Sequence, residues 1–298
     1  MIKATVIQDS ISTYGKRIIT FELEYMRFIH AELMTHREFS RNAASSRAIP
    51  IEKMLNHINQ FPATPIHWGK NQAGMSANGE LEQPTKIRVQ SIWNEAMMDA
   101  TKHSQNMSDE GAHKQIANRI TEPFQTMKVV VTSTEWDNWF WLRNHEDAQP
   151  EIRQLAKVML EAMDASSPMV LNPDEWHVPY ISRSRPMLGG PIIYSVADTE
   201  VSTEDAKMIS ASCCAQVSYR KSDDSIEKAR MIFDRLINSV PIHASPVEHQ
   251  ATPLAQPVAV FDTVWQQGVT HRRRDGTLCS GNFREWVQFR QLIPNQSK

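Results

Sequence analysis

Alternating apolar and polar positions mark the first regular element of the chain. Within residues 17–25, isoleucine, phenylalanine, leucine and tyrosine occupy every second position, separated by threonine and glutamate. Because successive side chains of a strand point to opposite faces, this pattern predicts a half-buried β-strand. In residues 28–40, Ile29 and Leu33 lie one helical turn apart and His36 continues the spacing, which predicts a helix that also carries Arg37. The chain is therefore expected to open with a strand that leads into a helix.

The later patterns predict mostly helices, with one further strand. β-Branched residues at 128–132 predict that strand. Thr134 is the predicted N-cap of a helix over 135–143, and Pro150 the start of another that ends at 163. Further helical patterns cover 91–119, 202–218 and 225–237. Two stretches rich in proline, glycine or side-chain amides interrupt them: 61–84 is predicted to be a long loop and 166–191 a linker.

Size, charge and cysteine content narrow the possible functions. The chain has 298 residues, enough for a full core, and 32 basic against 34 acidic side chains give a formal charge of −2. The chain as a whole therefore has no excess of positive charge that would indicate direct binding to nucleic acid. Three cysteines without metal-ligand spacing predict a reducing cytoplasm and no metal site. The first residues lack a signal-peptide pattern, and no run of about 18 apolar residues predicts a membrane span.

Donors for an anion are concentrated in residues 35–47. They are His36, Arg37, Ser40, Asn42, Ser45 and Arg47. One interpretation is a solvated helix end with local caps and ion pairs. The other is a nucleotide site, in which Arg47 binds a phosphate through two hydrogen bonds and His36 and Arg37 contact a second anionic or aromatic group.

Two other segments carry candidate chemistry. In residues 138–152, Arg143 and Asp147 are four positions apart and could form a surface pair. However, an arginine among three tryptophans is costly to leave unpaired, so a buried anionic or carbonyl partner is also expected. In residues 243–249, a Ser-Pro pair precedes Glu248 and a histidine, which by itself indicates only a turn into a strand.

Together these segments resemble the flavin-dependent thymidylate synthases. The family signature R-H-R-x-x-S-x-N-E-x-S-x-R-Y is similar to residues 35–48. The family's N-F-x-x-L-R, A-Q-x-E-I, A-R-x-x-L-P and H-x-S-P-F-E-H segments are similar to residues 138–143, 148–152, 118–123 and 243–249. The resemblance covers about residues 18–163 and 208–255.

The resemblance implies an α+β fold with a mixed or antiparallel sheet flanked by helices. It also implies a homotetramer with active sites between subunits, and one domain over 1–298, with a connection at 164–201 and an extension of unknown role at 256–298. In the family the S-P-F-E-H segment precedes the R-H-R segment, whereas here it follows. A circular permutation accounts for this order and predicts that the segment around Glu248 packs beside the strand 18–25.

The reaction implied by the resemblance is transfer of a one-carbon unit from methylenetetrahydrofolate to carbon 5 of deoxyuridylate. Reduced FAD supplies hydride, and NADPH recharges the flavin. Residues implied to hold the nucleotide are Ser45, Arg47 and Arg119, with Arg143 orienting and polarising the pyrimidine. Residues implied to line the flavin are His36, Arg37, Asn138, Ser245 and Glu248, with His243 near its reacting face.

Three departures from the signature leave alternatives open. Thr35 stands where the family has arginine, Ala43 where it has glutamate and Ala48 where it has tyrosine. A pocket changed in this way is compatible with deoxycytidylate as substrate, with a hydroxymethyl product, or with a flavin- or nucleotide-binding relative that has lost catalysis. Asn282 and Arg284 echo an Asn-x-Arg that the family uses near flavin, at positions where this chain has Thr132 and Thr134. The resemblance suggests that these two residues of the C-terminal segment substitute for it.

Overall fold

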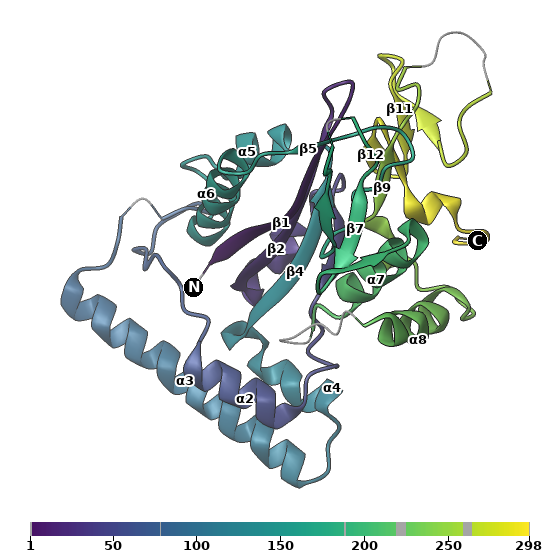
Figure 1. The fold of residues 1–298 in the computed structure, drawn as a ribbon. Coiled ribbons are helices and arrows are strands. Elements are labelled where there is room, and N and C mark those ends of the chain that lie inside the picture. The colour runs from purple at the N-terminus through teal and green to yellow at the C-terminus, as the bar shows by residue number, and fades with distance from the viewer. Residues whose placement is uncertain (1, 78, 188, 219–224, 259–263, 298) are drawn as a thin grey trace.

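A five-stranded sheet forms the centre of the computed structural model, which describes residues 2–77, 79–187, 189–218, 225–258 and 264–297. Its order is β3 (Ser40–Ala43), β4 (Thr126–Ser133), β2 (Arg17–Met26), β1 (Lys3–Ser12) and β5 (Met169–Leu171). All neighbours are antiparallel except β1 and β5, which are parallel. The sheet is therefore mixed and helices flank it (Figure 1), so the predicted α+β class is confirmed.

Both faces of the sheet are covered. The side chains of Phe21 and Leu23 on β2 pack against α5 (Asp137–Arg143) and α6 (Pro150–Asp164). On the other face, Val130 packs against the end of α7 (Thr203–Ala215), and α8 (Ile226–Ile237) lies against α7. Figure 1 shows these two helix pairs on opposite sides of the sheet. One face of the strand 17–25 is buried from residue 19 to residue 25, as its alternation predicted, and the other is buried at Ile18 and Thr20 but only partly at Glu22 and Glu24.

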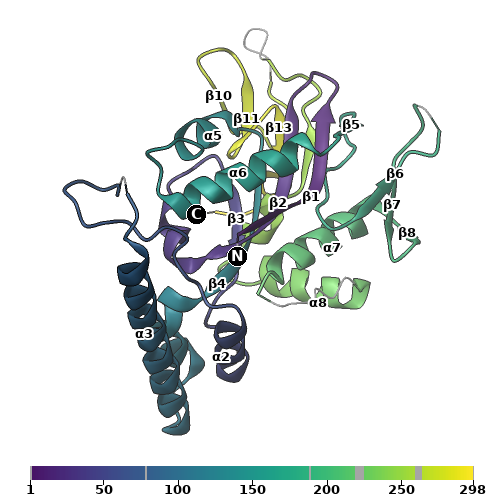
Figure 2. The same cartoon turned by 90° about the vertical axis from the view of Figure 1, so that its left-hand side faces the viewer.

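A helical group and the C-terminal segment lie at opposite ends of the sheet (Figure 2). The helical group consists of α2 (Ile51–Gln60), α3 (Gln83–Asp109), α4 (Lys114–Ala117) and η2 (Asn118–Phe124). Its apolar contacts join Met54 and Ile58 to Phe124 and to the half-buried Trp93 of α3. The C-terminal segment comprises β10 (His271–Arg272), β11 (Leu278–Ser280), β12 (Phe283–Arg284), β13 (Trp286–Gln288) and η4 (Phe289–Leu292).

The helix predicted over residues 28–40 is wrong in its second half. The chain forms η1 (Arg27–Ile29) and α1 (His30–Leu33), then turns and enters β3. Strand β3 pairs with β4, and Ser40 lies opposite Thr132. Ser40, the last residue of the predicted helix, therefore has its backbone in a strand that pairs with β4.

Most of the other predicted elements are present, with shifted ends. Strand β4 and helices α6, α7 and α8 are confirmed, as is the loop after Phe61, although α3 begins at Gln83 and ends at Asp109. Thr134 is not an N-cap, because α5 begins after Trp136 and the Thr134 hydroxyl accepts from the Arg284 backbone N–H at 2.9 Å. The predicted linker 166–191 is partly regular: it contains β5 and β6 (Ser182–Ser184), and β6 pairs with β7 (Ile193–Val196), which also pairs with β8 (Thr199–Val201).

The segment around Glu248 lies beside β2, as expected. It forms η3 (Ser245–Glu248) and β9 (Ala251–Pro253), and Ala251 shares a buried cluster with Ile18 of β2. The predicted neighbourhood is confirmed, while circular permutation remains a hypothesis about descent. Within the described ranges, no helix has the length and apolar composition needed to cross a membrane.

Candidate active site

Arg143 and His36 form the centre of a polar cluster between α5 and the turn before β3. The Arg143 Nε–H donates to His36 Nε2 at 3.1 Å, although the residues are 107 positions apart in sequence. Its Nη1 donates to Glu32 at 3.1 Å and its Nη2 to the Thr35 hydroxyl at 3.2 Å. The expected anionic partner of Arg143 is therefore Glu32. Asp147 is not its partner and lies 3.5 Å from His145 Nδ1.

Aromatic packing fixes this cluster. The His36 ring meets the Trp139 ring edge to face, with centroids 4.7 Å apart, and stacks on Phe39 at 5.7 Å. Trp139 is buried and anchors α5, which orients Arg143 at the end of that helix. Burial, and then the charges of Arg143 and Arg41, lower the pKa of His36 to about 4. The imidazole is thus neutral at pH 7 and accepts at Nε2, which places its proton on Nδ1.

A second polar cluster surrounds Glu248 and is built largely by the C-terminal segment. Arg290 forms an ion pair with the Glu248 carboxylate. Gln288 Nε2 contacts the Ser40 hydroxyl at 3.2 Å and donates to the Glu248 carbonyl at 3.1 Å. Burial raises the pKa of Glu248, while Arg290 and Arg41 act in the opposite direction. The clusters adjoin, because Arg41 also donates to the His36 carbonyl at 3.0 Å.

Asn282 and Arg284 lie where the sequence hypothesis placed them. Asn282 Nδ2 contacts the Ser40 hydroxyl at 3.1 Å, and Ser40 is the β-sheet partner of Thr132. The Arg284 backbone binds Thr134. Their position is thereby confirmed, and a contact with flavin stays a prediction. Sequence reasoning missed Gln288 and Arg290, because no local pattern distinguishes them from other polar residues of the tail.

A chain of buried hydrogen bonds crosses the sheet behind these clusters. His177 Nδ1 contacts the Ser10 hydroxyl at 2.7 Å and its Nε2 contacts the Thr20 hydroxyl at 2.8 Å. Thr20 contacts the Thr132 hydroxyl at 2.7 Å, and Thr132 contacts His249 Nδ1 at 2.8 Å. Strands β1, β2 and β4 are thus tied to the residue that follows Glu248.

Arg183 determines the direction in which the groups of this hydrogen-bond chain donate. Its guanidinium, which can only donate, contacts the Ser10 hydroxyl at 2.8 Å. The Ser10 hydrogen then has His177 Nδ1 as its acceptor, and each further hydroxyl donates toward His249. This assignment leaves the His249 Nε2–H buried and without a partner in the described part of the chain. Burial lowers the pKa of His249 to about 3 and that of His177 well below its ordinary value, so both rings are neutral.

The residues expected to hold the nucleotide gather at the other end of β3. Ser46 donates to Glu122 at 3.2 Å, and Arg119 lies 3.7 Å from the same carboxylate. The Ser45 backbone N–H donates to the Ser218 hydroxyl at 2.9 Å. Arg47 is exposed, and its side chain has no partner among the residues described. The turn that carries Ser45 and Arg47 therefore adjoins Arg119.

We call Ser45, Arg47 and Arg119 the nucleotide group. Arg143 is not part of it. Four residues of strand separate Ser40 from the turn at Ala44, which corresponds to roughly 14 Å. Within one protomer, Arg143 and Arg47 therefore belong to different ends of β3. The fold brings together His36 with Arg143, and separately Ser45 and Arg47 with Arg119.

Four of the residues that were predicted to line the flavin are exposed. The side chains of Arg37, Asn138, His243 and Ser245 have no hydrogen-bond or ion-pair partner within the described ranges. Arg37 follows His36, and Ser245 begins η3, three residues before Glu248. Their donors are therefore available to a ligand that spans the two adjoining clusters.

Comparison with known proteins places the chain in a family. A sequence model described as thymidylate synthase complementing protein matches residues 3–169, more than half of the chain. The chain belongs to this family. A relative, the flavin-dependent thymidylate synthase of Aquifex aeolicus (strain VF5), is 24% identical over 147 residues, which are 48% of this chain and 44% of the relative. The match therefore spans less than half of that protein's length.

Two solved structures are similar to this chain at a lower sequence identity. Both are of the UMP/dUMP methylase PolB from Streptomyces cacaoi. The complex with 5-Br UMP has a TM-score of 0.43 and 17% identity, covering 55% of this chain and 94% of that one. The complex with 5-Br dUMP has a TM-score of 0.44 and 18% identity, covering 55% and 90%.

The family match divides the site into two parts. His36, Arg143 and the nucleotide group lie within the matched residues 3–169. His243, Ser245 and Glu248 lie beyond them, together with the tail that contacts Ser40. The second part of the candidate site in this member of the thymidylate synthase complementing protein family thus lies in sequence outside the family match. In the described part of the chain, no group of three or more His, Cys, Asp or Glu side chains could hold a metal ion.

Proposed function

We propose that this chain transfers a one-carbon unit from methylenetetrahydrofolate to carbon 5 of deoxyuridylate and so forms thymidylate. The observation that carries the proposal is the Arg143–His36 pair, assembled from two distant segments within the residues that match the family. An arginine held in one orientation beside a neutral imidazole is suited to polarise a carbonyl of a bound pyrimidine. Polarisation there stabilises the negative charge that develops when carbon 5 becomes nucleophilic.

The donors near this pair fit a flavin. Arg37 and Ser245 offer a charge and a hydroxyl for phosphate oxygens, and Asn138 offers an amide. Glu248 can accept from ring or ribose donors, and His243 is free to approach the reacting face. When bound, reduced FAD would supply the hydride that completes the methyl group, with NADPH recharging it.

On the nucleotide side, Ser45, Arg47 and Arg119 would bind the phosphate. Because Arg143 lies at the other end of β3, we propose that the chain acts as a homotetramer whose sites combine residues of neighbouring subunits. Arg143 of one subunit would then meet a nucleotide held by Arg47 of another.

A single experiment tests the reaction. The purified, flavin-loaded protein is incubated with dUMP or dCMP and methylenetetrahydrofolate, with and without NADPH, and the product mass is measured. Arg143→Ala should lose turnover and keep its flavin spectrum, whereas Arg153→Ala, a change at an exposed arginine of α6, should match the wild type. Wild-type turnover by Arg143→Ala would refute the role of this residue. Absence of turnover with either pyrimidine in the wild type would favour a non-catalytic relative.

One observation favours a second candidate, hydroxymethylation. Ala48, at the position where the signature has tyrosine, lines a cavity beside the nucleotide group and leaves room there. Water in that room could capture the methylene adduct in place of hydride. The product would then be heavier than thymidylate by one oxygen atom, which the same mass measurement detects.

A further inference from the structure

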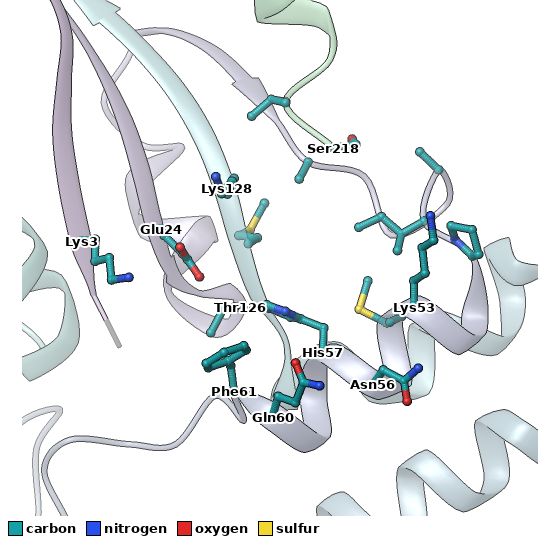
Figure 3. A pocket seen from close by; sticks show the side chains of 17 residues that line it. Lys3, Glu24, Lys53, Asn56, His57, Gln60, Phe61, Thr126, Lys128 and Ser218 are labelled. Carbon is teal, nitrogen blue, oxygen red and sulfur yellow. Dashed lines mark hydrogen bonds between the residues drawn. The ribbon is translucent and has the colours of Figure 1, made fainter. Parts of the chain in front are cut away.

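A cavity of about 890 Å³ lies between α2 and the sheet, next to the turn that carries Arg47. Figure 3 shows Lys3 and Glu24 on one side and Lys53 of α2 on the other. Apolar walls come from Ile49, Met54, Phe61, Met127 and Val217. Its size falls within the range of small-molecule sites, and its walls combine apolar surface with a few polar groups. None of the residues of the His36–Arg143 cluster lines it.

Most charges of this cavity are already balanced. Lys3 and Glu24 both line the cavity and lie opposite each other in the register of β1 and β2, so their charges offset each other. Lys128 donates to Glu22 at 2.8 Å. Lys53 also lines the cavity, yet its ammonium has no partner among the described residues. Arg47 does not line the cavity, but it is exposed in the adjoining turn, between the lining residues Ala44 and Ala48. Lys53 and Arg47 together offer two positive charges, which matches the charge of about −1.5 to −2 on a phosphate monoester at pH 7.

The same helix offers groups for a heterocyclic base. Asn56, His57 and Gln60 of α2 line the cavity together with the Phe61 ring (Figure 3). A carboxamide carries both an acceptor and a donor, as does the edge of a pyrimidine with its carbonyl and ring N–H. Aromatic rings provide a surface for stacking. The lining therefore suits a molecule with a small polar ring and an anionic end.

We propose that this cavity binds the pyrimidine nucleoside monophosphate, with Lys53 joining Arg47 at the phosphate and the side chains of α2 facing the base. The proposal rests on the proposed function and deepens it. It assigns nucleotide recognition to Lys53, Asn56 and Gln60, which lie outside the signature at residues 35–48. Ala48 lies in the cavity wall, so a substitution at this position changes the space around the nucleotide.

The test compares Lys53→Ala and Lys53→Glu with Lys102→Ala, an exposed lysine on α3 without a described partner. Calorimetry of the flavin-loaded protein measures Kd for dUMP, dCMP, deoxyuridine and tetrahydrofolate. Loss of one charged contact should weaken binding of both monophosphates roughly tenfold in Lys53→Ala. Charge reversal in Lys53→Glu should weaken it further. Deoxyuridine, which lacks the phosphate, should bind all variants equally, and thermal unfolding should be unchanged because Lys53 is exposed.

Two results would overturn the proposal. One is an unchanged Kd for dUMP and dCMP in both Lys53 variants. The other is a loss confined to tetrahydrofolate, which would assign the cavity to the carboxylates of the folate. The proposed function fails separately, if the wild type converts no pyrimidine while Lys53 still governs monophosphate binding. Conversely, if the wild type turns over fully and its nucleotide affinity does not depend on Lys53, only the assignment of this cavity to the nucleotide is refuted.

Discussion

Replacing Arg143 by alanine should destabilise the fold by an amount that depends on pH. At pH 7 the change removes the bonds to His36, Glu32 and Thr35. The bond to the buried imidazole is worth about 1 kcal/mol. The side chain of Glu32 is 36% exposed, so solvent screening limits the value of its ion pair to a few tenths of a kcal/mol. The expected loss in the free energy of unfolding is therefore about 1–2 kcal/mol.

Acidification changes this loss through the titration of His36. Its folded pKa is about 4, below the ordinary 6.5, so between these values the unfolded chain binds more protons than the folded one. The free energy of unfolding contributed by this residue is thus intact above pH 6.5 and falls as the pH drops toward 4, by at most about 3 kcal/mol. Burial is the main cause of the low pKa, and the charge of Arg143 is the next. Without that charge the folded pKa rises, and part of the acid-induced loss disappears.

Urea unfolding at pH 7 and pH 5 measures the effect, with Arg153→Ala as control. The difference in the free energy of unfolding between wild type and Arg143→Ala should be smaller at pH 5 than at pH 7. Arg153→Ala should have the same free energy of unfolding as the wild type at either pH. Since His177 and His249 titrate in all variants, the difference between variants isolates His36. NMR titration of the His36 ring should show the raised pKa directly. An equal gap at both pH values, with an unshifted His36 pKa, would refute the coupling.

Two further substitutions test the other polar groups. Thr132→Val keeps the shape of a fully buried side chain but removes the hydroxyl between Thr20 and His249, so urea unfolding should show a loss of about 2–3 kcal/mol. A loss no larger than that of Thr101→Val, at a partly exposed position of α3, would contradict the hydrogen-bond chain. Arg290→Ala leaves Glu248 half-buried and unpaired, so the destabilisation should be greatest at neutral pH and shrink as the pH falls through the Glu248 pKa, because the protonated acid needs no counter-charge. A pH-independent loss in the same unfolding assay would argue for packing alone.

The elements that sequence reasoning placed well are those with a strong local period. Alternation located β2, β-branched residues located β4, and Pro150 marked the first residue of α6. In each case the chain's own side-chain spacing decides which face is buried. The anionic partner of Arg143 was also foreseeable, because a guanidinium near buried tryptophans needs one.

Local pattern failed where a distant segment decided the outcome. Residues 34–40 were predicted to continue a helix, yet the chain turns after Leu33 and enters β3 at Ser40, because β4 offers backbone partners. Thr134 has the chemistry of an N-cap, but it binds Arg284 from the tail. In both places a long-range hydrogen bond satisfies a group that the local sequence assigned to a neighbour.

The sequence by itself determined the chemistry of this protein: the motifs at 35–48 and 138–152, the balance of charges and the family to which they point. Tertiary structure alone decided how those motifs combine. It joined Arg143 to His36, placed Arg290 on Glu248 and left Lys53 uncommitted at a cavity wall. The physical reason is that side-chain type and period are local properties. The partner that each charged group meets depends on which strands pair and which faces pack.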